Sequence, residues 1–458
     1  MLAREISRFV IGSQFSSLPP NVVTKAKGHI LDTLGVLVAA SADPLMDILD
    51  GYLTDLGLGD GATILGTGRR TSVVNAALVN GTLAHGLDYD DSSWRLIGHP
   101  SAAVLPAVLA IGEHQRSSGR DLLCAYVLGT EVSCKVGQAA EPELYEAGWH
   151  ATGVVGVLGA TAASAYLLHL TEAQLGTALG IAASLACGLR QNFGSLTKPF
   201  HAGAAAQHGV IAALLAKNGF TSNPTSLEGK SGFFHNFTGG KKNVESLKFG
   251  APFDILEPGF FVKPFPSCAA THTAIEATLD LVHRHKLQPG QIQKVQVGSG
   301  PVGPMMLVHR QPKTGFEGKF SMPFVVAMAI KDGRVGLESF TDENANHPVV
   351  RQLIAKIEFD VDSKFAGRTI DQAPANVTIT THDGEALAEC IEDPLGSPTK
   401  PMSGEALRGK FRDCLERRLT SGNIDRALEI LAALEELPDI GQLIRALVSA
   451  TKAQTYSN

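Results

Sequence analysis

GWHATGVVG (residues 148–156) and TKPFHAGAAAQHG (residues 197–209) enclose a long helical pattern rich in alanine and glycine, and this part of the chain gives the clearest indication of the fold. Its many small residues predict closely packed helices, as in a bundle. Polar side chains that can act as acid, base or cation stand among residues too small to cover them, which indicates the wall of a site. These polar residues are Tyr145, His150, Lys198, His201 and His208.

The spacing around Lys198 predicts how these groups are presented. His201 and His208 are seven residues apart, which on a helix places both on one face. Lys198 precedes Pro199, and we expect Pro199 to be the first residue of a helix, because proline favours that position. Taken singly, each histidine is better explained as a core residue, and Lys198 as a solvated loop residue. Their clustering favours a site.

The composition sets the class of protein. A chain of 458 residues exceeds one compact core, so two domains are expected. The net charge of −6 gives no basic stripe for nucleic acid. The six cysteines form no C-x-x-C pair, which argues against a zinc site. The first residues lack a signal-type apolar core, and the longest apolar passage, residues 154–168, is short for a membrane span, so we expect a cytoplasmic protein that binds no membrane.

Helical patterns dominate the first 260 residues. Leu31, Leu34 and Val38 follow helical spacing, with Asp32 turned away from that stripe. Thr171 and Gln174 have the spacing of a capping box, which predicts a further helix start. No sustained strand pattern interrupts this region, so it is expected to be all-helical.

One segment, HGLDYDDSSWRLIGHPSAAV (residues 85–104), is unusually dense in histidine and aspartate. Such side chains can ligate a divalent ion, but no second feature of the sequence fixes a ligand geometry, so we expect no metal. The alternative is an acidic loop whose aspartates cap helices and orient histidines. We favour a mixture, in which Asp90 or Asp91 orients a neighbour and His99 faces the substrate at a helix start.

The pattern changes near residue 260. FFVKPFPSCAATHTAIEA (residues 260–277) holds two prolines close together and marks a domain boundary. NVTITTHDGEALAEC (residues 376–390) alternates around the turn pair Asp383-Gly384 and predicts a hairpin. The fold class is therefore mainly α, with an all-helical bundle domain and a smaller α+β lid domain. We expect the bundle in residues 1–266, completed by residues 403–458, and the lid in residues 267–402.

Six motifs in this order resemble those of the MmgE/PrpD family: GTLAHGLDYDD, GHPSAAVLPA, GWHATGVVG, TKPFHAG-x₃-QHG, KPFPSCAATH and KFSMPFVVAMAIKDG. The resemblance implies a helical bundle with an α+β lid, a homodimer, and a pocket between the domains for substrates with several carboxylates. It implies no organic cofactor and no metal. By matching motifs, His99, His150, Lys198 and Lys263 carry over as pocket residues, and His201 and His208 lie in a matching segment.

The family includes 2-methylcitrate dehydratases, cis-aconitate decarboxylases and iminodisuccinate epimerases. Their shared step moves a proton at a carbon next to a carboxylate, for which lysines and histidines are suited. Decarboxylase-like members have a histidine where this chain has Cys268, which favours elimination or epimerisation. We therefore expect an epimerase of an iminodisuccinate-like acid, with Tyr145 and Lys198 on opposite faces of the substrate and each of them needing a lowered pKa to act as a base.

Three alternatives stand beside the epimerase. The first is a 2-methylcitrate dehydratase-like lyase, in which His150 would be the acid that protonates the leaving hydroxyl. The second is a cis-aconitate decarboxylase-like lyase. The third is not an enzyme but a small-acid binding protein, which would explain the helices but not the clustering of lysine, histidine and tyrosine among small residues.

Overall fold

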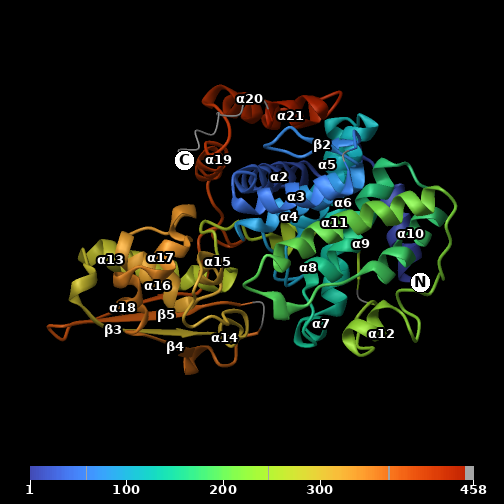
Figure 1. The fold of residues 1–458 in the computed structure, drawn as a ribbon. Helices are drawn as coiled ribbons and strands as arrows, with labels where there is room; N and C mark the ends of the chain where they lie inside the picture. The colour runs from blue at the N-terminus through green and yellow to red at the C-terminus, as the bar shows by residue number, and fades with distance from the viewer. Residues whose placement is uncertain (58, 246, 370–371, 449–458) are drawn as a thin grey trace.

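The computed structural model describes residues 1–57, 59–245, 247–369 and 372–448. It has a larger helical part and a smaller part built on a sheet, which lie side by side (Figure 1). This confirms the predicted fold class. The helices before residue 260 are α1 (Leu2–Gly12), α2 (Pro20–Ala40), α3 (Pro44–Leu56), α4 (Val73–Gly86), α5 (Pro100–Gln115), α6 (Gly119–Ala140), α7 (Glu143–Glu146), α8 (Ala151–Val154), α9 (Gly156–Leu167), α10 (Glu172–Leu185), α11 (Thr197–Lys217) and α12 (Phe233–Thr238).

The smaller part holds a mixed sheet of four strands in the order β4-β3-β5-β6. β3 pairs with β4 in parallel and with β5 antiparallel, and β5 and β6 form the predicted hairpin. Helices α13, α16 and α18 lie over the sheet (Figure 1). The elements are α13 (His272–His285), β3 (Ile292–Ser299), α14 (Val302–Met306), α15 (Gly315–Gly318), α16 (Met322–Asp332), α17 (Asp342–Asn346), α18 (Pro348–Ile354), β4 (Ile357–Val361), β5 (Ala375–Thr381) and β6 (Ala386–Ile391).

The chain then returns to helix in α19 (Gly404–Leu415), α20 (Ser421–Ala432) and α21 (Gly441–Ala446). α19 packs against α2, and the red C-terminal helices lie beside the larger part (Figure 1). Their apolar side chains, among them Phe411 and Leu443, join the same buried cluster as those of α1 to α11. These contacts support the proposal that residues 403–458 complete the bundle, and the residues after 448 lie outside the described part.

Two glycines let α4 and α11 pack closely. A Cβ on Gly81 would lie 2.7 Å from the Cα of Gly203, and a Cβ on Gly203 would meet the carbonyl oxygen of Leu78. Real Cβ atoms do not approach backbone this closely, so both positions need glycine. The close approach matters for function, because α4 leads into the His/Asp-rich segment and α11 carries Lys198.

Two predictions made from the sequence were wrong. α11 begins at Thr197, so Lys198 lies within the helix and Pro199 is its third residue. The proline is tolerated there because the first-turn N–H groups have no partner inside a helix. Asp32, which we placed away from the apolar stripe, is buried beside Lys410 of α19. That partner lies far along the chain and could not be read from local spacing.

The described residues contain no single helix that is both apolar and long enough to cross a membrane. Within the same residues, α2 and α3 taken together reach that length and composition, and they are bent by 79° relative to each other.

Replacing Gly203 with alanine tests the close packing of α4 and α11. The added methyl meets backbone, so we expect a loss of about 1–3 kcal/mol in the free energy of unfolding, the usual effect of overpacking. Gly51→Ala in α3 is the matched control, because no atom lies within 4 Å of its added Cβ. Urea unfolding of both variants checks this, and a Gly203→Ala protein as stable as Gly51→Ala would contradict it.

Candidate active site

A cavity lies where the two parts meet. The larger part contributes Tyr145 and Lys198, and the smaller part contributes Met306 and Phe320. Its charged and polar lining includes Asp88, His99, Tyr145, His150, Lys198 and Lys263. The cavity is therefore bounded by both cores. We call its charged side, formed by Asp88, Lys198 and Lys263, the base of the cavity.

Asp88 joins two buried lysines at this base. Its Oδ1 accepts a hydrogen bond from Lys198 Nζ at 2.6 Å, and its Oδ2 lies 3.3 Å from Lys263 Nζ. The Lys263 ammonium donates to the backbone carbonyl of Asp88 at 2.9 Å. Asp88 has a φ of 51°, a left-handed conformation that aspartate adopts more readily than most residues. This turn, just after α4, aims the carboxylate at both lysines.

The charges of the cluster explain the ionisation of Asp88. Burial alone would raise the pKa of its carboxyl group, but Lys198 and Lys263 outweigh burial and hold that pKa well below the usual range. Two ammonium groups thus share one carboxylate, which leaves positive charge for a substrate carboxylate.

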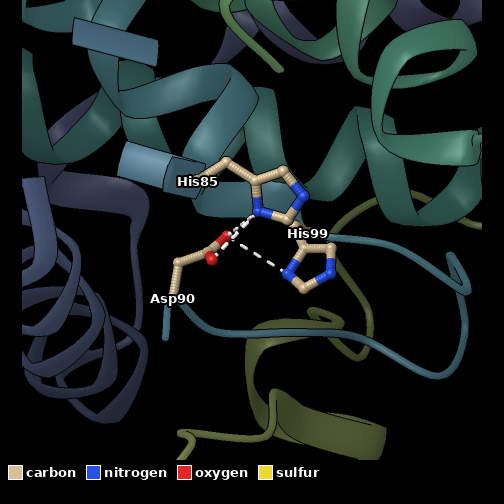
Figure 2. A group of neighbouring side chains, drawn as sticks. All are labelled: His85, Asp90 and His99. Carbon is tan, nitrogen blue, oxygen red and sulfur yellow. Dashed lines mark hydrogen bonds and ion pairs between the residues drawn. The ribbon is translucent and has the colours of Figure 1, made fainter. Parts of the chain in front are cut away.

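His85 bridges this cluster to Asp90, and Figure 2 shows its contact with Asp90. Its Nδ1 lies 3.0 Å from both carboxylate oxygens of Asp90, and its Nε2 lies 2.8 Å from Lys198 Nζ. Burial and the nearby Lys198 lower the pKa of His85 to about 3, against the opposing pull of Asp90. The neutral imidazole therefore carries its proton on Nδ1, donates to Asp90, and accepts from Lys198 at Nε2.

His99 shares Asp90 with His85 (Figure 2). Its Nδ1 lies 3.1 Å from Asp90 Oδ2 and 2.9 Å from the carbonyl oxygen of Asp91, so the Nδ1–H donates to both acceptors. His99 caps the start of α5, where its backbone N–H donates to Thr152. Its Nε2 makes no hydrogen bond to any residue of the described part, which leaves it free to exchange a proton with a ligand.

His150 and His201 extend the row of imidazoles. The His85 and His150 rings lie 5.8 Å apart between centroids, and the Nδ1 atoms of His150 and His201 lie 3.1 Å apart. Burial, with Lys198 nearby, lowers the pKa of His201 to about 4 and holds that of His150 well below its usual value. Both are therefore neutral near pH 7. This argues against His150 as the acid for a leaving hydroxyl.

Tyr145 lines the cavity with a hydroxyl that has no hydrogen-bond partner among the described residues. Burial raises the pKa of this phenol, although the Arg190 guanidinium 3.8 Å from the ring centre opposes the rise. The expectation of a lowered pKa was therefore wrong, since desolvation outweighs the single cation. Tyr145 stays protonated near neutrality, as a donor and not a base.

Two profiles of known protein domains match nearly the whole chain. A profile of the MmgE/PrpD N-terminal domain matches residues 4–246, and one of the MmgE/PrpD C-terminal domain matches residues 265–436.

The chain belongs to the MmgE/PrpD family.

Several relatives within the MmgE/PrpD family carry a named activity. The chain is 30% identical to the cis-aconitate decarboxylase of Homo sapiens, over 98% of this chain and 94% of the relative. It is 29% identical to that of Mus musculus, over 95% and 91%. It is 26% identical to the 2-methylcitrate dehydratase of Salmonella typhimurium, over 89% and 90%. The expected likeness to an iminodisuccinate epimerase therefore gives way to a likeness to lyases.

The structure brings most of the residues singled out in the sequence to one place. Lys198, Lys263, His99, His150 and Tyr145 line the cavity, and His201 contacts His150 just behind the wall. The remaining three stand apart from it: His208 binds the Leu185 carbonyl at 2.9 Å and does not line the cavity, Asp90 orients two histidines, and Asp91 binds His29 and Ser101.

Sequence reasoning assigned no role to the residue at the centre. Asp88 was visible only as one acidic residue among several, and its partners lie 110 and 175 residues away along the chain. The apolar walls were also missed, because large apolar residues are usual in cores. These walls are formed by Trp94, Ile97, Phe193, Met306 and Phe320.

His85, Asp90 and His99 stand close enough to hold a metal ion, with ligand atoms within 4.8 Å of one another. Their surroundings do not fit one. A histidine that binds metal through one nitrogen normally donates its other N–H to an acceptor. In His85 that other nitrogen, Nε2, faces the ammonium of Lys198, which is itself a donor. The absence of a metal from the function stays a prediction.

Asp88→Asn tests the charge cluster through stability and pH. The variant leaves two buried ammonium groups without a counter-charge, so we expect a loss of about 3–5 kcal/mol at pH 7. Because the pKa of Asp88 is depressed in the folded state, its contribution is present above its unfolded pKa and is lost as the pH falls through its folded pKa. The difference between wild type and variant should therefore persist from pH 8 to about 5 and shrink below about 4.

The control is Asp425→Asn, which removes an exposed partner of Arg412 and should change stability by less than about 1 kcal/mol. Urea unfolding across the pH range gives the measurement. A gap at pH 7 no larger than that of the control, or one unchanged down to pH 3, would contradict the assignment.

Proposed function

We propose that this protein is a lyase for small polycarboxylic acids, and that it decarboxylates an acid of the cis-aconitate type. The observation that carries the proposal is the meeting of two ammonium groups, two imidazoles and one phenol in a single cavity. The named activities of its MmgE/PrpD relatives support the substrate class.

The base of the cavity suits the recognition and activation of such an acid. Lys198 and Lys263 can each contact a substrate carboxylate while they retain Asp88. When a C–C bond to a carboxylate breaks, CO₂ leaves and its electron pair stays on the remaining fragment. That negative charge is delocalised into the neighbouring carboxylate system, where fixed ammonium groups stabilise it.

The proton that completes the decarboxylation comes from His99, and Tyr145 assists as a hydrogen-bond donor. His99 is held by Asp90 with its Nε2 free, so it can take a proton from water and deliver it to carbon. Tyr145 keeps its proton and can donate a hydrogen bond to the substrate. The aromatic walls exclude water around the carboxylate that leaves, which favours its loss as neutral CO₂.

Dehydration of an acid of the 2-methylcitrate type is the second candidate. Cys268 favours it, because this chain has a thiol at the position where decarboxylase-like members have an imidazole. Burial raises the pKa of the Cys268 thiol to about 11, so it is neutral and does not replace a charged acid near pH 7. In this reaction His99 Nε2 would remove the proton beside a carboxylate, and Tyr145 would protonate the hydroxyl as it leaves.

Epimerisation of an iminodisuccinate-like acid has weaker support than either elimination. It needs one base on each face of the carbon, and Tyr145 with a raised pKa is not a base near neutrality. Lys198, the other member of the expected pair, already donates to Asp88 and His85. A homodimer in the cytoplasm, as the sequence suggested, stays a prediction.

Incubation of the protein with cis-aconitate, 2-methylcitrate and iminodisuccinate in deuterated water, followed by NMR, tests the proposal. We expect loss of CO₂ from cis-aconitate, with one deuterium on the carbon that receives the proton. Water loss from 2-methylcitrate would select the second candidate. Exchange of iminodisuccinate alone, or turnover of none of the three acids, would contradict a lyase.

Variants assign the proton transfer on whichever acid is turned over. His99→Gln should lower kcat by about 10²–10⁴-fold with little change in KM, because it removes an acid–base group. His208→Gln is the matched control, since His208 lies on the same helix as Lys198 but outside the cavity, and it should behave as wild type. Equal kcat values in these two variants would remove His99 from the mechanism.

A further inference from the structure

Three consecutive backbone carbonyls, those of residues 87–89, each accept a hydrogen bond from a different buried lysine. Leu87 accepts from Lys319 Nζ at 2.7 Å. The Asp88 carbonyl accepts from Lys263, as described above, and Tyr89 accepts from Lys410 Nζ at 2.8 Å. The left-handed φ of Asp88 turns these carbonyls in different directions, so the lysines can approach from separate elements.

Lys319 and Lys410 also bind a second segment, residues 263–266, which carries Lys263. Lys319 donates to the carbonyl of Pro266 at 2.9 Å, and Lys410 donates to that of Lys263 at 2.9 Å. Each ammonium therefore links the turn that carries Asp88 to the segment that carries its partner. Neither of the two lysines lines the cavity.

These two lysines come from elements outside the bundle's first twelve helices. Lys319 follows α15 in the smaller part, and Lys410 lies in α19. Their linkage makes the position of Asp88 depend on the docking of both elements.

The environment of Lys319 shows that burying its ammonium group has a high free-energy cost. It is 4% exposed, and no carboxylate of the described residues lies within ion-pair distance of it. Burial lowers the pKa of its ammonium to about 7, although Asp88 opposes the change. Lys410 is nearly as buried but pairs with Asp32 at 2.6 Å. An apolar residue would fill either position at a lower free-energy cost. The two ammonium groups are therefore expected to have a role of their own.

We propose that Lys319 and Lys410 are positioning residues that hold residues 87–89 against residues 263–266, so that the Asp88 carboxylate meets Lys198 and Lys263. Their effect on turnover rests on the proposed function. Their effect on the geometry of Asp88 does not, because that geometry is observable without a substrate.

Lys319→Met and Lys410→Met test the proposal, with Lys135→Met as the matched control. Lys135 is also a buried lysine that bridges two segments, through Asp254 at 3.1 Å and the carbonyl of Pro252, but it touches neither residues 87–89 nor residues 263–266. We expect kcat to fall about 10- to 100-fold in the two test variants, the usual result of displacing a catalytic group by about 1 Å, with a smaller change in KM.

The control separates positioning from stability. Lys135→Met should lose thermal stability comparably and keep the kcat of wild type. A wild-type kcat in both test variants, or an equal fall of kcat in Lys135→Met, would overturn the proposal. Where a methionine variant does not fold, the arginine variant decides: it keeps the charge but moves the donors, and a wild-type kcat in Lys319→Arg and Lys410→Arg would likewise overturn it.

Crystal structures of the variants give a readout that needs no turnover. We expect Asp88 to leave its left-handed conformation and Lys198 Nζ to move out of hydrogen-bond distance of its Oδ1. An unchanged Asp88–Lys198 contact in Lys319→Met and Lys410→Met would overturn the proposal. If wild type turns over none of the three acids, the proposed function fails, and this geometry alone decides the positioning role.

Discussion

The buried carboxylate of Asp88, shared between two ammonium groups, is the constraint on which the rest of the site depends. An unpaired ammonium in this cavity would be strongly disfavoured, and so would a carboxylate without its lysines. The chain meets this demand by bringing α4, α11 and residues 263–266 to one point. The close packing at Gly81 and Gly203 and the left-handed turn at Asp88 follow from it.

The same cluster sets the protonation of its neighbours. Positive charge and burial keep His85, His150 and His201 neutral, so three of the four imidazoles in the row are not general acids near pH 7. His99 is partly exposed and has Asp90 behind its Nδ1. In the proposed mechanism, proton transfer is therefore assigned to His99 and Tyr145, while Lys198 and Lys263 supply charge.

The sequence predicted the features that depend on local pattern or on recurring motifs. Helical spacing predicted the bundle, and the alternation before Asp383-Gly384 predicted the hairpin. The dense motifs also led to Lys198, Lys263 and His99. The sequence did not predict ion pairs between residues remote along the chain, such as Asp32 with Lys410 or Asp88 with its lysines. Nor did it predict pKa directions such as that of Tyr145, because desolvation depends on what covers a group in three dimensions.

A crystal structure of the wild-type protein with tricarballylate tests the central claim most directly. This saturated tricarboxylic acid has neither the double bond nor the hydroxyl group that the proposed eliminations use. The account predicts one carboxylate within hydrogen-bond distance of Lys198 and Lys263, with Asp88 still between them, and a substrate carbon facing His99 Nε2. A ligand bound away from these lysines, or one that displaces Asp88 from both of them, would contradict the account.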